Sequence, residues 1–168
     1  MYQRILVPID GSSTSSRGLA EAIQLAKLTG GRLRLVHVID ELSFALAMDA
    51  YSGYAGNWLE ELRANATKLL ETTRAKAAGE GIEADTVLID RFKGAVHDQV
   101  IAEAQASNAD LIVIGTHGRR GIGRWVMGSS AEHILRMAPV PVLLVRAPEQ
   151  ARTEHERFTL PSGEVAIQ

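Results

Sequence analysis

The chain has 168 residues, 23% of them charged, and a formal net charge of −2. A chain of this length buries a substantial core but is short for two domains, so we expect one domain. The charge balance gives no overall attraction for nucleic acid or an anionic membrane. The absence of cysteine excludes disulfides, thiolate metal ligands and cysteine nucleophiles.

The N-terminal sequence MYQRILVPID is typical of a strand. It lacks the charged segment and the long apolar core of a secretory signal peptide. No apolar stretch is long enough to cross a bilayer. We therefore expect a soluble, cytoplasmic protein without a membrane span.

Short apolar runs alternate with longer helical patterns along the chain, which indicates βαβ units and a parallel sheet. The runs are almost continuous in Val, Ile and Leu, which favours strands covered on both faces. In chain order, we expect a strand over 4–9, a helix ending at 30–31, a strand over 33–39, a helix over 58–78, a strand over 85–89, a helix over 95–107, a strand over 111–114, a helix over 130–137 and a strand over 141–145.

The helices are predicted from apolar residues at helical spacing and from their start and stop signals. The first follows the serine and threonine cluster SSTSS, and Gly79 is the expected stop of the second. Pro139 is expected to end the fourth. The residues expected to be buried are Leu19, Ala22, Ile23 and Ala26 in the first helix, Leu59, Leu62, Ala66, Leu69 and Leu70 in the second, and Val96, Val100 and Ala104 in the third.

Two segments show no clear period. Residues 41–57 are partly apolar and interrupted by glycines, which is typical of a loop or a lid. Residues 148–168 are polar with two brief apolar patches, and we expect a mobile or partner-dependent tail there.

The sequence GTHGRRGIGRWVMGSS follows the fourth predicted strand. Ligands of open α/β sheets bind outside the carboxyl ends of the strands. Glycines let a backbone approach an anion closely, and the free N–H groups of a helix starting near Ser129 would attract phosphate. Ser129 and Ser130 would serve as helix N-caps and as hydroxyl donors. The P-loop pattern is absent because this stretch has no lysine, and no GxGxxG follows the first strand.

The spacing of this stretch is GxxG, nine residues, then G[ST], formed by Gly115, Gly118, Gly128 and Ser129. Together with ILVPID, LVHVID and PVPVLLVR at three strand ends, it resembles the ATP-binding branch of the universal stress protein family. The resemblance covers residues 1 to about 147. It implies a universal stress protein domain over 1–147, with the tail over 148–168.

By this resemblance, the fold is an open five-stranded parallel sheet of order 3-2-1-4-5 with helices on both faces, adenine nucleotide alpha hydrolase-like or Rossmann-like. Pro8 and Asp10 match positions that line the adenosine pocket, and the backbone of Val38 would meet the adenine edge. The loop around ribose and phosphates would comprise Gly115, Thr116, His117, Gly118, Arg119, Arg120 and Gly121. The turn that holds the phosphate chain would comprise Gly128, Ser129, Ser130 and Ala131.

Three residues have alternative roles. Asp10 could instead cap the first helix. Asp40 could bind magnesium through water, although a turn role is the simpler reading. His117 could act as a general base, but no nucleophile and carboxylate partner converge on it in the sequence, so we interpret it as a residue that shapes the loop.

Other residues near the site also have two readings. Arg119, Arg120 and Arg124 could bind phosphate oxygens or could form an ordinary solvated loop. Trp125 is expected to pack the loop onto the sheet. His37 lies in an apolar strand and is expected in the core or near a dimer interface.

We expect a protein that binds ATP, with or without Mg²⁺, and acts as a stress-response or signalling switch with little turnover. No catalytic residue and no metal ligand is assigned, because no base or water-positioning residue for hydrolysis is identifiable. The alternatives are a slow ATPase or nucleotidyl- or phosphoryl-transfer enzyme using His117, Asp10 and Asp40, and a dimeric scaffold without nucleotide. In the strand order that the resemblance implies, the apolar fifth strand lies at the sheet edge, so we predict a homodimer through antiparallel fifth strands, as in many family members.

Overall fold

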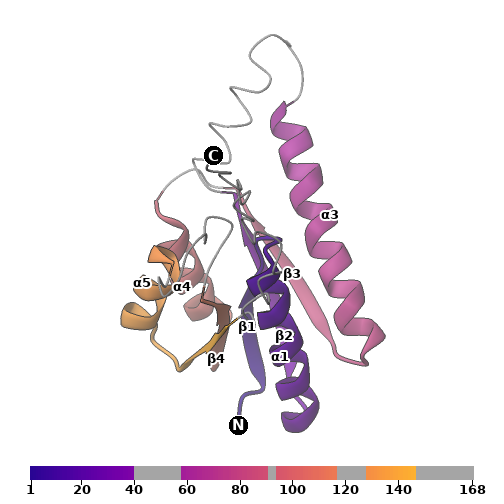
Figure 1. The fold of residues 1–168 in the computed structure, drawn as a ribbon, viewed down its shortest axis with the longest axis vertical. Helices are drawn as coiled ribbons and strands as arrows, with labels where there is room; N and C mark the ends of the chain where they lie inside the picture. Colours follow the sequence, from indigo (N-terminus) through magenta and orange to yellow (C-terminus); the bar gives the residue numbers. More distant parts are fainter. Residues whose placement is uncertain (40–57, 91–93, 117–127, 147–168) are drawn as a thin grey trace, which may run out of the picture.

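The computed structural model describes residues 1–39, 58–90, 94–116 and 128–146. Strands and helices alternate along the chain (Figure 1). The elements are β1 (Arg4–Pro8), α1 (Ser13–Thr29), β2 (Arg32–Val38), α3 (Trp58–Gly79), β3 (Ala84–Ile89), α4 (Val96–Ala106), β4 (Leu111–Gly115), α5 (Ser129–Met137) and β5 (Val142–Val145). The predicted segments 41–57 and 148–168 lie outside the described residues.

The strands form one parallel sheet of order β3-β2-β1-β4-β5, which confirms the predicted topology. In the centre of the sheet, Ile5 of β1 is paired with Leu33 of β2 on one side and with Leu111 of β4 on the other. The chain order reverses between β1 and β4, because β2 and β3 extend the sheet in one direction and β4 and β5 in the other. Ligands of open α/β sheets bind at such a reversal.

Helices cover both faces of the sheet, because successive residues of a strand point to opposite faces. Ile5 and Val7 pack with α1 and α3, in a core that includes Leu19 and Leu70. Leu6 points the other way and packs with α4 and α5, next to Val100. In Figure 1, α4 and α5 accordingly lie to one side of the strands and α3 to the other. The near-continuous apolar strands therefore reflect burial on both sides.

The first helix begins and ends as its sequence signals predict. The Ser12 hydroxyl accepts a hydrogen bond from the Ser15 N–H at 3.1 Å, which makes Ser12 the N-cap of α1. Gly30 follows the last residue with φ +67°, and its N–H donates to the Ala26 carbonyl. Glycine adopts this left-handed conformation without steric cost, so the Gly30 stop is confirmed.

One predicted helix end is confirmed, and one helix start differs from its prediction. Helix α3 ends at Gly79, as predicted, and in the turn after it the Gly81 N–H donates to the Ala78 carbonyl at 2.9 Å, with φ +77° at Gly81. Helix α5 begins at Ser129, and Gly128 holds the N-cap position without a side-chain cap hydrogen bond. Ser129 and Ser130 thus lie in the first turn and do not serve as N-caps.

None of the helices in the described part of the chain combines the length and the apolar character needed to cross a membrane. The predicted bounds of all five strands agree with the structure to within one residue.

Candidate functional site

The predicted site residues that the structure describes lie at or next to the carboxyl ends of the strands. Pro8 ends β1, Val38 ends β2 and Gly115 ends β4, and parallel strands end at the same edge of a sheet. Helices α1 and α5 both begin at this edge, which we call the carboxyl edge. Five predicted site residues lie outside the described residues, namely His117, Gly118, Arg119, Arg120 and Gly121, and so do Asp40, Arg124 and Trp125.

Thr116 fixes the start of α5 beside the end of β4. Its N–H donates to the Val145 carbonyl at 2.9 Å, and its carbonyl accepts from the Gly128 N–H at 2.8 Å. Thr116 is buried, with 7% of its surface exposed. The stretch between Thr116 and Gly128 therefore starts and finishes at two residues that are hydrogen-bonded to each other. This bond brings the first turn of α5 to the carboxyl edge.

The first turn of α5 presents backbone donors there. The first intrahelical hydrogen bond runs from the Glu132 N–H to the Gly128 carbonyl at 3.0 Å. The N–H groups of Ser129, Ser130 and Ala131 precede it, and such groups have no acceptor within their own helix. Ser129 is exposed, Ser130 is half-buried and Ala131 is buried. With the helix dipole, these donors favour an anion at this position.

Gly115 is required by packing between α1 and β4. A Cβ atom on Gly115 would lie 2.8 Å from both the backbone carbon and the carbonyl oxygen of Thr14. A Cβ on Gly18, one turn further along α1, would lie 3.5 Å from the Gly115 nitrogen, which is ordinary contact. The glycine thus lets α1 approach the end of β4. This is a different reason from the close approach of a ligand that the sequence indicates.

The turn before α1 is organised by Asp10. Its Oδ1 accepts a hydrogen bond from the Ser12 N–H at 2.9 Å, and Ser12 in turn caps the helix. The Ser12 and Thr14 hydroxyls lie 3.0 Å apart, and Thr14 is buried. Asp10 therefore is not the N-cap of α1, contrary to the alternative reading. Its carboxylate is half-buried at the carboxyl edge.

Sequence reasoning missed the part that α1 plays at this edge. The SSTSS cluster predicts a helix start, but it does not show that Thr14 touches Gly115. The structure brings the N-termini of α1 and α5 to the same edge, one on each face of the sheet. One feature of the sequence could have indicated this arrangement, because Ser and Thr residues follow both β1 and β4.

His37 belongs to the core. It is buried, and its Nδ1 lies 2.6 Å from the carbonyl oxygen of Ile9. A carbonyl oxygen only accepts, so Nδ1 carries the proton and donates. This bond ties β2 to the segment that follows β1, which is the core role that the sequence analysis considered.

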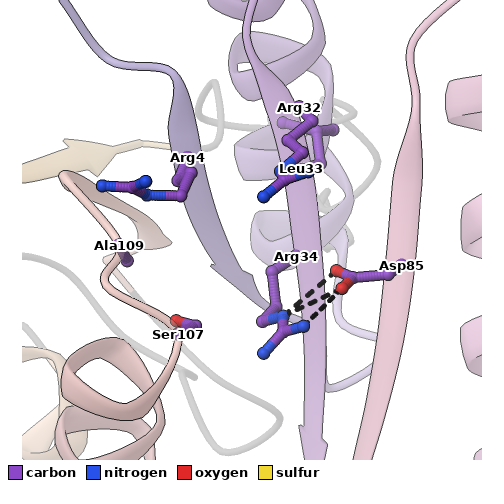
Figure 2. Close-up of a pocket in the computed structure, with 7 residues that line it drawn as sticks. All are labelled: Arg4, Arg32, Leu33, Arg34, Asp85, Ser107 and Ala109. Carbon is purple, nitrogen blue, oxygen red and sulfur yellow. Dashed lines mark hydrogen bonds and ion pairs between the residues drawn. The ribbon is translucent and has the colours of Figure 1, made fainter.

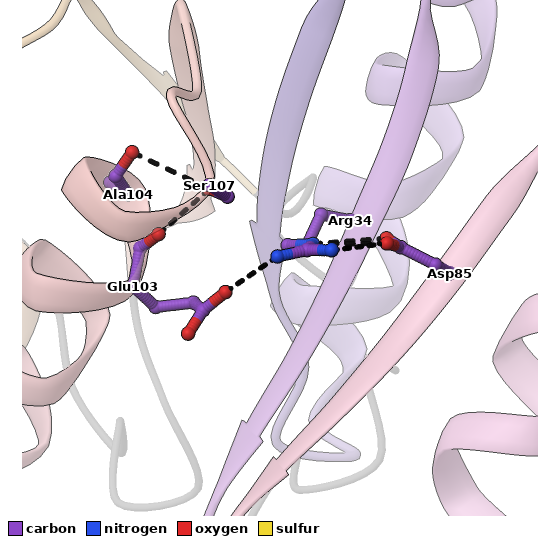
Figure 3. Close-up of polar contacts among 5 residues, drawn as sticks. All are labelled: Arg34, Asp85, Glu103, Ala104 and Ser107. Atoms are coloured by element: carbon purple, nitrogen blue, oxygen red, sulfur yellow. Dashed lines mark hydrogen bonds and ion pairs between the residues drawn. The ribbon is translucent and has the colours of Figure 1, made fainter.

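A small surface pocket lies at the opposite, amino edge of the sheet (Figure 2). It is lined by Arg4, Arg32, Leu33, Arg34, Asp85, Ser107 and Ala109. Figure 3 shows Arg34 between two carboxylates, with Asp85 of β3 on one side and Glu103 of α4 on the other. The hydrogen bonds that Arg34 donates to the Asp85 carboxylate raise the pKa of Arg34 further above its ordinary value, so the guanidinium stays charged. We interpret this cluster as a link between the sheet and α4.

Comparisons with known proteins find similar proteins over most of the chain. The model of the universal stress protein family matches residues 1–146. A universal stress protein of Methanocaldococcus jannaschii is 29% identical over an alignment of 153 residues that covers 89% of this chain and 85% of that protein. One of Bacillus subtilis is 28% identical, covering 87% of this chain and all of that protein. The structure of the universal stress protein from Archaeoglobus fulgidus in complex with dAMP is 26% identical, with a TM-score of 0.64 over 86% of this chain and 98% of that one.

Proposed function

This chain belongs to the universal stress protein family, and we propose that it binds an adenine nucleotide, ATP in the first place, at the carboxyl edge of its sheet. The observation that carries the proposal is the Thr116–Gly128 hydrogen bond, which places the first turn of α5 at the end of β4. The edge lies where the strand order reverses, between β1 and β4. The dAMP bound by the relative from Archaeoglobus fulgidus supports an adenine nucleotide as the ligand class.

We assign the adenosine to the side of the edge formed by β1 and β2. Pro8 and Asp10 would line the adenosine pocket, and the backbone of Val38 would meet the adenine. All three residues are half-buried, so each keeps some surface for a ligand. A carboxylate such as that of Asp10 accepts hydrogen bonds from hydroxyl groups, which suits a ribose.

We assign the phosphates to the side formed by β4 and α5. The N–H groups of Ser129, Ser130 and Ala131 would donate to phosphate oxygens, next to Gly115, Thr116 and Gly128. The family resemblance adds His117, Gly118, Arg119, Arg120 and Gly121 to this set, and Mg²⁺ would accompany a triphosphate. Together these groups would bind phosphate without the lysine of a P-loop.

The bound nucleotide would act as a switch rather than as a substrate. Nucleotide state would change the surface that a partner protein meets, in a domain over 1–147 with a tail over 148–168. Among the described residues at the carboxyl edge, Asp10 is the one carboxylate that the site assignment includes, and its Oδ1 is held by the Ser12 N–H. Because this oxygen already accepts a backbone hydrogen bond, Asp10 is less available to position a water for attack, which favours binding with little hydrolysis.

The fifth strand would join two copies of the chain. In the described sheet β5 lies at the edge, hydrogen-bonded to β4 on one side. Leu143 of β5 is 41% exposed, and Met137 at the end of α5 is 61% exposed. An apolar strand with an unpaired side is a template for pairing with another chain. Antiparallel pairing of two β5 strands would cover this surface.

The test is calorimetric titration of ATP, AMP and GTP into tag-free, dialysed protein. ATP should bind more tightly than AMP, because it brings more phosphate oxygens to the α5 donors, and GTP should bind least. Equal binding of ATP and GTP would contradict the adenine assignment. Equal binding of ATP and AMP would contradict the role of α5.

A further inference from the structure

A cluster of metal-binding side chains lies on the surface of the α4–α5 layer. His97 and Asp98 are in the first turn of α4, and His133 is in α5. One ligand atom from each of the three lies within 4.8 Å of those of the other two. No residue of this cluster belongs to the proposed nucleotide site. We infer that His97, Asp98 and His133 bind a divalent transition-metal ion, with Zn²⁺ as the reference ion.

The two imidazole rings are already in contact. Their centroids are 3.8 Å apart, and the ring planes are tilted by 30°. The Asp98 carboxylate lies 3.8 Å from Nε2 of His97. Three ligands from two helices thus converge on one point, although His97 and His133 are far apart in the sequence.

The three ligand atoms need to move only slightly closer together to bind one ion. Zinc bonds to nitrogen and oxygen are about 2 Å long, so two atoms on one ion lie at most about 4 Å apart. The side chains can make this movement, because Asp98 is 63% exposed and His97 is 21% exposed. His133 is also exposed, and within the described ranges no hydrogen bond holds its ring. Rotation about the side-chain bonds would bring the three atoms into reach of one ion.

The helices that carry the ligands are fixed relative to each other. Val100 of α4 and Ile134 of α5 lie in the same core cluster and are 0% and 1% exposed. Ile134 directly follows His133, and Val100 is three residues after His97. A shared core below the ligands keeps their backbones in place, which lowers the entropic cost of binding.

The ligand types select the class of ion. Two imidazoles and one carboxylate suit Zn²⁺, Ni²⁺ or Cu²⁺, whereas Mg²⁺ and Ca²⁺ prefer oxygen ligands alone. Three protein ligands leave a fourth position of a tetrahedral zinc ion to water or to another molecule. The site would therefore be open on its outer side.

The experiment is titration of ZnCl₂ into tag-free protein without nucleotide, followed by Co²⁺ as a spectroscopic probe. Wild-type protein should bind one Zn²⁺ per chain, and Co²⁺ should show the visible absorption of a four-coordinate site. His97→Ala, His133→Ala and Asp98→Asn should each weaken Zn²⁺ binding by about tenfold or more, since even residues outside the ligand shell contribute that much. Circular dichroism verifies that each variant is folded.

The matched control uses His155, a histidine that belongs neither to the cluster nor to the proposed nucleotide site. The variant His155→Ala should bind Zn²⁺ as the wild type does. Loss of binding in that variant would overturn the inference, as would unchanged binding in His97→Ala and His133→Ala. Because no nucleotide is present, the result is independent of the proposed ATP site.

Discussion

The backbone of Gly128 donates a hydrogen bond to the carbonyl of buried Thr116 at 2.8 Å, and this bond sets the start of α5 against the end of β4. A helix N-terminus at the carboxyl end of a central strand is where α/β sheets bind anions. Thr116 is fixed in turn by β5, through the Val145 carbonyl. Thr116 therefore connects β5, the strand that we propose for dimerisation, to the proposed phosphate site through backbone hydrogen bonds.

Gly115→Ala should destabilise the fold. The added Cβ would lie 2.8 Å from the Thr14 carbonyl, which is shorter than any relaxed contact, so α1 must move away from β4. We expect a loss of about 1–3 kcal/mol in the free energy of unfolding, measured by urea denaturation. Gly79→Ala is the control, because a Cβ there meets no atom within 4 Å. Equal stability of the two variants would contradict the packing role of Gly115.

Arg34→Met should also destabilise the protein, because it removes the cation that pairs with neighbouring carboxylates. Glu103 is 17% exposed at its side chain and is paired with Arg34 at 2.9 Å, so the substitution leaves a largely buried carboxylate without its cation. An unpaired buried group costs about 1–3 kcal/mol. Adding Glu103→Gln to Arg34→Met should recover part of the loss, which a double-mutant cycle measures. Simple additivity of the two substitutions would show that the pair is not coupled.

The Lys27–Glu80 contact predicts that the stability of the fold depends slightly on pH. The hydrogen bond from Lys27 lowers the pKa of Glu80 below its ordinary value of 4.5. A carboxyl with a lowered pKa in the folded state contributes stability above its unfolded pKa, and this contribution is lost as the pH falls through the folded pKa. Side-chain NMR titration should therefore give Glu80 a pKa below 4.5. Lys27→Met should return the Glu80 pKa to its ordinary value, and an unchanged low pKa would assign the shift to another cause.

Leu143→Lys should convert the proposed dimer to a monomer. Leu143 is 41% exposed on the edge strand, and a lysine there places a charge in the strand-pairing surface. Leu28→Lys is the matched control, since Leu28 is 84% exposed on α1 and does not belong to the edge strand. Light scattering at micromolar concentration should show a dimer for the wild type and the control. A monomeric wild type, or a dimeric Leu143→Lys variant, would refute pairing through β5.

The fold could be predicted from the sequence because its signals are local. Runs of Val, Ile and Leu mark strands buried on both faces, and Gly30 marks a helix end that only a residue with positive φ can form. The strand order came from the family resemblance rather than from any single strand. The start of α5 was missed by one residue, because serine is a better N-cap residue than glycine and yet Gly128 holds that position.

The contacts that could not be predicted join residues far apart in the sequence. Nothing in the pattern of α1 indicates that Thr14 approaches Gly115 so closely that a Cβ would clash. The contact between the His97 and His133 rings depends on how α4 and α5 pack, which residue spacing within either helix does not encode. The motif was enough to predict candidate roles for residues at the carboxyl edge. It did not predict the hydrogen bond between Thr116 and Gly128, which only the structure shows.

ATP titration into wild type, Gly128→Val and Gly79→Val tests whether the start of α5 binds nucleotide phosphates. Gly128 has φ −60° and ψ 140°, an extended conformation open to valine, so the variant adds bulk at the phosphate side without backbone strain. Losing one charged hydrogen bond costs about 1.5–3 kcal/mol, so Gly128→Val should weaken ATP binding by about tenfold or more. Gly79→Val should bind as the wild type does. Equal affinity in all three proteins, or no ATP binding by folded wild type, would show that the start of α5 does not bind nucleotide phosphates.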